Sequence, residues 1–274
     1  MRRLLRAAGV LLVVLLAYLA LWPVPADPVA WRAPAFTGYA GPHAANQRLS
    51  AAQVVSVAPG IGPEHIDVGP DGKLYTALLS GDVLRMNPDG SAQQVVVNTG
   101  GRPLGFDFTV DGRLVVADAI RGLLDIGSDG TVTVLADQID GDPIRYADGV
   151  VIAGDGVMYF TDASRRFSPR ELGTFDASVL DILEHSCTGR VLAYDPASRS
   201  TSLVIGGMCF PNGVALSGDG RHLFIAETGS YRIWKVDAAV RGLDAGELAP
   251  AGDARARVIA DNLPGFPDNL TRSA

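Results

Sequence analysis

The feature that most constrains the fold of this chain is a pattern that returns four times: an Asp-Gly turn, an apolar strand, a polar break and a second strand. The copies are "GPDGKLYTALLSGDVLRMNPDG", "TVDGRLVVADAIRGLLDIGSDG", "AGDGVMYFTDASRRF" and "SGDGRHLFIAETGSYRIWKVD". Equivalent positions are Leu74, Leu114, Met158 and Leu223, at intervals of 40, 44 and 65 residues. Short strands separated by such turns form antiparallel meanders. A period of about 40 to 50 residues with about four strands per unit predicts an all-β fold, a β-propeller of four-stranded blades.

Two other fold classes fit less well. An α/β fold requires helices that alternate with the strands, and no segment with helical periodicity does so. A β-sandwich does not favour so regular an internal repeat. The long third interval is explained by the insertion "SRRFSPRELGTFDASVLDILEHSC", in which we expect Ser178 to Glu184 to form a helical turn between two strands.

The first 26 residues form a separate segment. Three arginines in the first six positions precede an uncharged apolar stretch from Ala7 to Trp22 and a proline-rich exit. At about 1.5 Å per residue, the stretch suits a signal peptide or a short signal anchor. Trp22 is typical of an interfacial anchor, and the best cleavage site, Val24-Pro25-Ala26, is a poor one, so an anchor is favoured over a cleaved signal. Either alternative predicts that residues from 27 onward face the extracytoplasmic side, anchored in the membrane or, after cleavage, secreted or periplasmic.

The charge balance argues against a nucleic-acid partner. The chain has 23 basic and 30 acidic residues, a net charge of −7, and its only arginine-rich run lies within the first six positions. Nucleic-acid-binding domains present a basic patch or stripe. The expected partners are therefore a small molecule and, through the N-terminal segment, a membrane, while the oligomeric state stays open.

The two cysteines, Cys187 and Cys209, lie on either side of a predicted hairpin. Export would permit a disulfide. If the turn is centred on Ser198, the hairpin register places the two thiols opposite each other. Because turn boundaries are uncertain by a few residues, bridged and free thiols both remain open at this point.

Oxygen donors recur where each predicted blade begins. The loop into the innermost strand of a propeller blade points toward the central channel. Such loops carry Glu64 in "GIGPEHIDVG", Asp148 in "IRYADGVVIA", Asn212 in "CFPNGVALS", and Asp268 with Asn269 in "GFPDNL". The alternative explanation is that these are only the polar residues that turns ordinarily contain. Because they occupy equivalent positions in successive repeats, a common site on the central axis is favoured. A set made only of oxygen donors suits Ca²⁺ rather than zinc.

Longer motifs resemble the strictosidine synthase-like family over almost the whole chain, roughly Pro25 to Leu270. They include "GPEHI", "GGRPLGFDF", "YFTDAS", "TGRVLAYDP", "FPNGVALSGDG" and "NLPGFPDN", in the order that is typical of the family. The resemblance implies a six-bladed propeller related to gluconolactonase, regucalcin and paraoxonase. Many such proteins hold an axial Ca²⁺ and hydrolyse lactones or aryl esters.

The resemblance also implies which residues bind the metal. Glu64, Asn212 and Asp268 match metal-binding positions of these hydrolases. Asp148 stands where the hydrolases usually have asparagine, so that the chain offers three carboxylates and one amide. This departure either tightens Ca²⁺ binding or indicates a site without the hydrolases' metal.

In a hydrolase of this kind, Ca²⁺ would polarise the substrate carbonyl and a carboxylate would activate water. Asp148 and Asp268 are the candidate catalytic bases. His65 and His185 are weaker candidates because the histidines are scattered, and Glu184 would lie at the channel mouth.

Two further acids are expected to have structural roles, and the role of one arginine stays open. Asp162 and Glu227 follow strands and are expected to accept hydrogen bonds at strand ends rather than bind metal. Arg102 in "GGRPLG" is either structural or a contact to a substrate carboxylate.

The leading functional hypothesis is a Ca²⁺-dependent esterase or lactonase. The alternatives are a non-catalytic propeller that binds a ligand or protein, and a strictosidine synthase-type enzyme that forms a carbon–nitrogen bond. The synthase reaction uses a glutamate in a later blade, which has no counterpart here, so that activity does not transfer.

The predicted organisation is an anchor or signal at 1–26, a linker with a ring-closing strand at 27–52, and a partial propeller at 53–274. Four blades can be counted, from Gln53, Gly100, Asp148 and Asn212, and Asp268 would open a fifth. A six-bladed ring requires about two blades more, and open blade faces lose apolar burial. The sequence therefore predicts a truncated copy with reduced or no activity.

Overall fold

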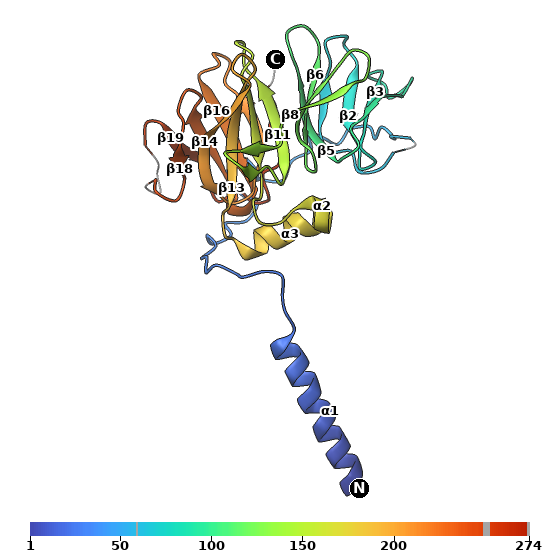
Figure 1. Ribbon diagram of the computed structural model, residues 1–274, viewed down its shortest axis with the longest axis vertical. Coiled ribbons are helices and arrows are strands. Elements are labelled where there is room, and N and C mark those ends of the chain that lie inside the picture. The colour runs from blue at the N-terminus through green and yellow to red at the C-terminus, as the bar shows by residue number, and fades with distance from the viewer. Residues whose placement is uncertain (59, 249–252, 273–274) are drawn as a thin grey trace.

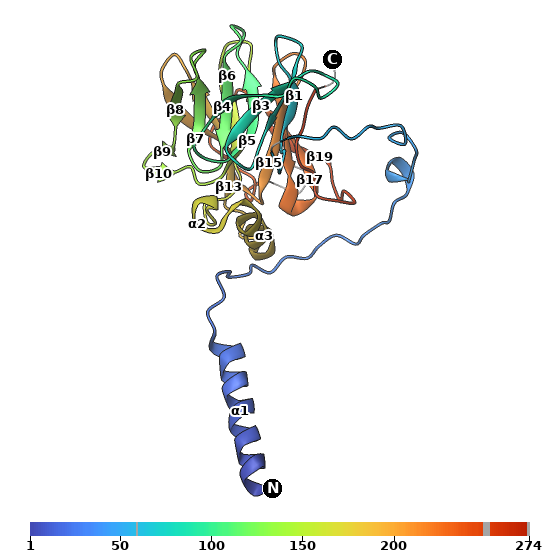
Figure 2. The same cartoon turned by 90° about the vertical axis from the view of Figure 1, so that its right-hand side faces the viewer.

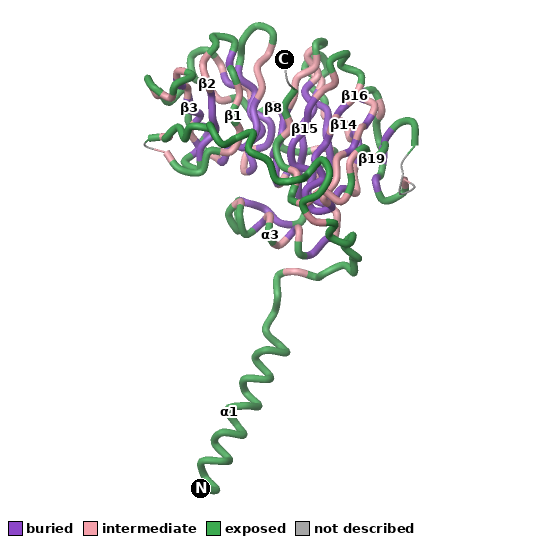
Figure 3. The backbone as a smooth tube through the Cα atoms, turned by 180° about the vertical axis from the view of Figure 1, so that it is seen from behind, coloured by how far each residue is buried: buried purple, intermediate pink, exposed green. Residues whose placement is uncertain are grey.

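The computed structural model describes residues 1–58, 60–248 and 253–272 of the 274-residue chain. It contains one N-terminal helix, α1 (Arg2–Leu21), an extended linker and a body of antiparallel sheets (Figure 1). Buried residues are concentrated in the sheets, whereas α1 is exposed along its whole length (Figure 3).

Each larger sheet is a meander in which strands pair in sequence order, except that one short strand between the last two strands of the fourth sheet joins the edge of the third. The first contains β1 (Ile66–Val68), β2 (Leu74–Ala77), β3 (Asp82–Met86) and β4 (Gln94–Asn98), and the second contains β5 (Pro103–Phe108), β6 (Leu114–Asp118), β7 (Gly122–Ile126) and β8 (Val132–Ala136). The third contains β11 (Ala147–Ile152), β12 (Met158–Asp162), β13 (Gly189–Asp195), β14 (Ser200–Met208) and, in parallel at its edge, β18 (Leu243–Asp244). The fourth contains β15 (Pro211–Leu216), β16 (His222–Glu227), β17 (Arg232–Asp237) and β19 (Ala256–Ala260), and β9 (Gln138–Ile139) pairs with β10 (Asp142–Pro143). The predicted all-β fold of repeated four-stranded units is confirmed.

Neighbouring innermost strands pack backbone against backbone at glycines. A Cβ atom added to Gly149 would lie 2.7 Å from the carbonyl oxygen of Asn212, and one added to Gly213 would lie 2.5 Å from that of Asp268. A Cβ on Gly105 would likewise meet the Gly149 backbone, at 2.9 Å. In proteins a Cβ atom essentially never lies within 3.0 Å of a non-bonded heavy atom. Only glycine therefore permits the strands to pack this closely.

Buried carboxylates fasten the loops that lead into the innermost strands. Asp162, at the end of β12, is fully buried, accepts the backbone N–H of Tyr146 at 2.9 Å and pairs with Arg190 at 2.9 Å. Glu227, at the end of β16, is also fully buried and accepts the backbone N–H of Cys209 at 2.9 Å. The predicted role of both acids as strand-end acceptors is confirmed.

The insertion in the third sheet forms two helices, α2 (Pro169–Leu172) and α3 (Thr174–Glu184), and is thus longer than the predicted helical turn. The two helices are separated by Gly173, whose φ of 80° lies in the left-handed region. The Tyr146 hydroxyl donates to the carbonyl of Thr174 at 2.9 Å and so ties the start of α3 to the sheets. In both Figure 1 and Figure 2, α3 covers the face of the sheets that lies nearest to α1.

A disulfide joins Cys187 to Cys209 across the β13–β14 hairpin. The register differs from the uniform one that the turn position predicts. Near the turn Asp195 pairs with Ser200, and two register shifts then bring Gly189 opposite Met208. Bulges of this kind add residues to one strand only, which is why the position of a turn does not fix the register of a whole hairpin.

The segment before the sheets also differs in detail from the prediction. Residues 27–52 contain no strand, only a 3₁₀ turn at Gly41–His43, so the expected ring-closing strand is not formed there. Helix α1 has 20 residues, or about 30 Å, which matches the hydrocarbon thickness of a bilayer. By length and composition α1 could cross a membrane, as could a signal sequence at this position.

The buried pair of Asp162 and Arg190 gives a stability prediction. Asp162→Ala leaves Arg190 with only the half-buried Asp142 as a partner and leaves the N–H of Tyr146 without its acceptor. The free energy of unfolding should therefore fall by about 3–5 kcal/mol. The matched control is Asp253→Ala, which removes an exposed carboxylate that pairs with Arg255 and should lower the free energy of unfolding far less. Urea unfolding of both variants measures the difference, and equal losses would contradict the fastening role of Asp162.

Candidate axial site

Four of the five predicted oxygen donors line one pocket of about 340 Å³, on the face where α3 lies. They are Glu64, Asp148, Asn212 and Asp268. Further polar lining comes from Arg102, Tyr146, Thr174, Ser178 and Thr228, and apolar lining from Leu104, Phe175, Ile182, Phe210 and Phe266. The pocket is therefore lined by carboxylates together with a partly aromatic wall.

The glycine packing explains why the donors converge. Asp148 and Asn212 each directly precede a packed glycine of an innermost strand, Gly149 and Gly213. Asp268 occupies the same position in the segment that packs against Gly213. In the second sheet the residue before the packed glycine is Leu104, so that sheet contributes an apolar side chain to the pocket.

The loops that hold Glu64 and Asp268 are fastened by hydrogen bonds. The backbone N–H of Glu64 donates to the carbonyl of Ala77 in β2 at 3.0 Å. The Thr228 hydroxyl donates to the carbonyl of Pro267, immediately before Asp268, at 2.6 Å. These bonds hold both carboxylates at the pocket without occupying their oxygens.

Two buried acceptors at the base of the pocket have no hydrogen-bond partner among the described residues. They are Oδ1 of Asp148 and Oδ1 of Asn212, on residues that are 3% and 7% exposed. A buried acceptor without a partner costs free energy, and more when it is charged. Two such oxygens on adjacent strands, beside two further carboxylates, form a donor set that suits a hard cation.

Burial raises the pKa of all three carboxylates, and neighbouring negative charges raise the pKa of Asp148 and Glu64 further. Burial, and then the charges of Glu64 and Asp268, hold the pKa of Asp148 well above its usual value. Burial also raises the pKa of Glu64, assisted by Asp268 and opposed by Arg102. The pKa of Asp268 is raised by burial and opposed by a hydrogen bond from Asn212. Each shift disfavours the charged form, so a bound cation would relieve all three.

Arg102 is the one cationic residue among those that line the pocket. Its Nη2 lies 3.6 Å from a Glu64 oxygen and donates to the carbonyl of Gly62 at 3.3 Å. Its Nε and Nη1 are buried and have no partner among the described residues. Two of the three guanidinium nitrogens of Arg102 thus make no hydrogen bond to the described part of the chain.

The carboxylates line the pocket without converging on a point. Among the described residues, no three ligand atoms from the axial acids lie within 4.8 Å of one another. The Glu64 side chain is turned toward Arg102 and is 29% exposed, so it has room to rotate. Such a rotation would release Glu64 from Arg102 and free it to join a cation bound by Asp148 and Asn212.

Other predicted site residues lie outside the pocket lining. Asn269 donates from Nδ2 to the backbone carbonyl of Glu64 at 3.4 Å and is not among the lining residues. His65 lies at a larger pocket on the opposite face, where its ring packs edge-on against Phe106 at 4.8 Å. Glu184 is buried in an ion pair with Arg166 at 2.6 Å rather than placed at the channel mouth.

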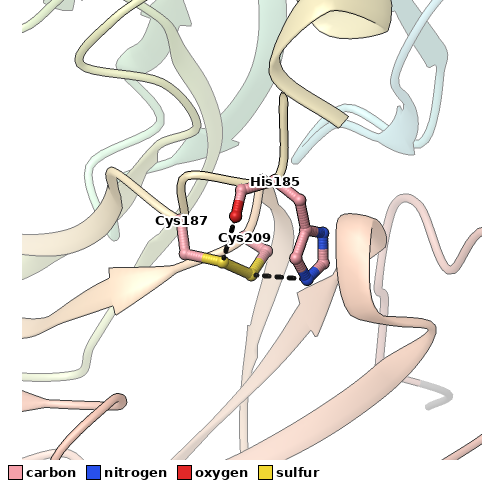
Figure 4. A group of neighbouring side chains, drawn as sticks. All are labelled: His185, Cys187 and Cys209. Atoms are coloured by element: carbon pink, nitrogen blue, oxygen red, sulfur yellow. Dashed lines mark hydrogen bonds between the residues drawn. A yellow bond between two sulfur atoms is a disulfide. The ribbon is translucent and has the colours of Figure 1, made fainter. Parts of the chain in front are cut away.

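His185 lies beside the disulfide, as Figure 4 shows, and not in the axial pocket. Its Nε2 is 3.6 Å from Sγ of Cys209, and its ring stacks on Trp31. His185, Cys187 and Cys209 are the only three His, Cys, Asp or Glu residues in the described part of the chain with ligand atoms within 4.8 Å of one another. Because both sulfurs are in the disulfide, they offer no thiolate to a metal.

Sequence reasoning named Arg102 without deciding its role, and it missed the apolar side of the pocket. Arg102 lies two residues before Leu104, as Tyr146 lies two residues before Asp148. Aligning the repeats at the packed glycines would have placed both at the channel, since Phe210 and Phe266, two positions before Asn212 and Asp268, also line the pocket. Phe175 comes from α3, which lies outside the repeat, and no periodic signal points to it.

Family models match two parts of the chain. The model described as strictosidine synthase-like, N-terminal, matches residues 41–86, and the model described as strictosidine synthase matches residues 148–238. Protein STRICTOSIDINE SYNTHASE-LIKE 7 of Arabidopsis thaliana is 35% identical over 253 residues, which cover 89% of this chain and 63% of that protein. Adipocyte plasma membrane-associated protein of Salmo salar is 31% identical over 248 residues, 84% of this chain and 55% of that protein. The chain thus spans about 55–63% of the length of these relatives.

Solved structures share the fold. A gluconolactonase from Xanthomonas campestris aligns with a TM-score of 0.56 at 19% identity, covering 76% of this chain and 78% of that one. Regucalcin from Agrobacterium tumefaciens, described as a calcium-binding protein, aligns with a TM-score of 0.54 at 15% identity, covering 77% and 63%. At these identities the likeness establishes the propeller fold alone.

The raised pKa of Asp148 gives a prediction about cation binding and pH. Because the folded protein holds the Asp148 proton more tightly than the unfolded chain, stability in chelator should fall as pH rises above the ordinary aspartate value of about 3.9. Calcium should reverse this loss at neutral pH, by about 2.7 kcal/mol at a hundredfold excess over its Kd. Thermal unfolding with Ca²⁺ and with chelator, across pH 4 to 8, measures both effects.

The matched variants for this measurement are Asp148→Asn and Asp140→Asn. Asp148→Asn should stabilise the protein in chelator at neutral pH and abolish the calcium effect. Asp140 is exposed with a φ of 52°, which asparagine tolerates, so Asp140→Asn should change neither. A calcium effect that survives in Asp148→Asn would contradict the assignment of Asp148 as a ligand.

Proposed function

This chain belongs to the strictosidine synthase-like family, and from that premise we propose that it is a calcium-dependent hydrolase of esters or lactones. The observation that carries the proposal is the pair of unpartnered buried oxygens on Asp148 and Asn212, at the same phase of adjacent innermost strands. The calcium-binding description of regucalcin and the lactonase description of the Xanthomonas protein support the chemistry by analogy.

In this proposal Glu64, Asp148, Asn212 and Asp268 hold the ion. Calcium bound there would supply a Lewis acid that polarises the substrate carbonyl. Asp148 is 3% exposed and acts as a fixed ligand, whereas Asp268 is open to solvent. Asp268 is therefore the better placed of the two candidate bases to accept a proton from an attacking water molecule.

The remaining lining residues bind and orient the substrate. The water oxygen attacks the carbonyl carbon, its proton passes to Asp268, and the same proton then goes to the leaving alkoxide oxygen. The unpartnered Nε and Nη1 of Arg102 are available to the carbonyl oxygen as negative charge develops on it. Leu104, Phe210 and Phe266 offer an apolar wall for the acyl or alkyl part.

The proposal also includes the location of the protein. We propose that α1 stays in the membrane and that the sheets lie on the extracytoplasmic side, because three arginines lie at the start of α1 and no basic cluster follows it. The disulfide between Cys187 and Cys209 supports the extracytoplasmic location, because disulfides persist in oxidising compartments.

The catalytic assignment predicts that two carboxylate variants behave differently. Asp268→Asn should lower kcat on aryl esters or lactones by about 10²- to 10⁴-fold and retain most of the calcium-induced stabilisation. Asp148→Asn should lose both activity and stabilisation. The kcat and the calcium-induced stabilisation of each variant are measured in the full chain, with and without chelator. Each value is then divided by that of the Asp140→Asn control.

Two results would overturn the proposal. Full activity in Asp268→Asn, or turnover that is insensitive to chelator, would exclude the proposed mechanism. Calcium-induced stabilisation without turnover of any ester or lactone would instead favour the rival function, a propeller that binds a ligand without reacting with it.

Arg102 gives an independent prediction within the same site. Arg102→Met keeps the length of the side chain and removes its donors, so kcat should fall by about 10²- to 10³-fold. Arg102→Lys retains the charge but not the paired nitrogens and should recover only part of the loss. If kcat is unchanged in Arg102→Met, the residue serves only to balance the charge of Glu64.

A further inference from the structure

Helix α3 presents an apolar stripe that no described residue covers. Leu172 just before it is 38% exposed, and Phe175, Val179 and Leu183 on it are 76%, 37% and 67% exposed. Residues four positions apart lie on the same face of a helix, so these side chains form one continuous strip, here named the α3 stripe. The opposite face of α3 is buried against the sheets, with Ala177 fully covered.

The chain between α1 and α3 is short and fixed at its far end. Ala26 packs in the core cluster beneath α3, and the backbone N–H of Asp27 donates to the Glu184 carboxylate at 2.8 Å. The backbone N–H of Val29 donates to the Glu184 carbonyl at 2.8 Å. Four residues lie between Leu21, the end of α1, and Ala26, and the five Cα–Cα steps can span at most about 18 Å. The end of α1 therefore cannot lie farther than this from the point where the linker docks beside α3.

A row of aromatic rings connects the docked linker to the pocket. Trp31 stacks on His185, with ring centroids 4.2 Å apart, and lies 6.3 Å from Tyr231. Tyr231 stacks on Phe266 at 4.8 Å, and Phe266 lines the axial pocket. Phe266 and Trp31 are 54% and 42% exposed. Residues 26–31 of the linker, the α3 stripe and the pocket thus share one face of the protein, the face nearest to α1 in Figures 1 and 2.

We propose that the α3 stripe docks on the surface of the lipid bilayer that holds α1. The proposal rests on the membrane location proposed above and is independent of the catalytic assignment. The short tether favours a lipid surface over another partner, because it holds the stripe within reach of the membrane at all times. The exposed charges around the stripe come from Arg165, Arg166, Arg170, Glu171 and Asp176 and almost cancel, so apolar contact should dominate.

Docking would decide which molecules reach the pocket. Phe175 and Ile182 of α3 line the pocket, and Phe175 is also part of the α3 stripe. A pocket whose wall lies on the bilayer receives molecules that partition into the interface. The substrate class is then an amphiphilic ester or lactone rather than a freely soluble sugar derivative.

Spin labelling of the full chain in liposomes tests the docking directly. Both natural cysteines are in the disulfide, so one introduced cysteine is the only thiol to label. The variants are Phe175→Cys and Leu183→Cys on the α3 stripe, Val110→Cys as the control, and Leu12→Cys in α1. Val110 is 96% exposed in the turn between β5 and β6, at the opposite end of the sheets from α3. Leu12→Cys reports separately whether α1 is inserted in the bilayer.

The measurement is the accessibility of each nitroxide to oxygen, which concentrates in lipid, relative to a water-soluble nickel chelate. Docking predicts a ratio at positions 175 and 183 that is severalfold higher than at 110. Ratios at 175 and 183 equal to that at 110, with position 12 in lipid, would overturn the docking while leaving the anchor in place. Labels at 175 and 183 shielded from both reagents would mean that a protein or a second copy covers the stripe, which also overturns it. Position 12 outside lipid would refute the anchor and the docking together.

Discussion

Backbone contact between innermost strands is the constraint on which the site depends. Gly149 and Gly213 let each strand approach the next so closely that a single methyl group would collide with a carbonyl oxygen. The residue before each glycine is thereby brought to the central axis, whatever its chemistry. Asp148 and Asn212 become neighbours in this way, although 64 residues separate them in the sequence. The same packing brings Leu104 to the axis from the second sheet, where it contributes only apolar surface.

Placing acids together at a buried axis is costly, and the structure offsets only part of the cost. The carboxylates that fasten the strand ends are satisfied: fully buried Asp118 accepts the N–H groups of Arg102, Ile120 and Arg121. Asp148 has a buried oxygen with no partner and a raised pKa. Buried acids that are fully hydrogen-bonded are structural, whereas an incompletely satisfied one at the end of a pocket is typical of a functional group.

Much of the fold and part of the site could be predicted from the sequence, because both depend on local signals. Asp-Gly turns and alternating strands mark the sheets, and the phase of the repeat identifies the donors Glu64, Asp148 and Asn212. The length of α3, the shifts in the β13–β14 register and the place of Asn269 outside the pocket depend on tertiary packing. The partners of Arg102 could not be predicted either, since no sequence pattern shows which of its nitrogens remain unpaired.

The central claim is that the glycine-packed strands place a cation site at Asp148 and Asn212. Anomalous diffraction from crystals of the full chain soaked in terbium, which replaces calcium at oxygen-rich sites, tests it most directly. The account predicts one strong peak within coordination distance of Asp148 Oδ1 and Asn212 Oδ1, with the Glu64 side chain rotated away from Arg102. An axis without a terbium peak, with the Arg102 guanidinium hydrogen-bonded to Asp148 in its place, would contradict it.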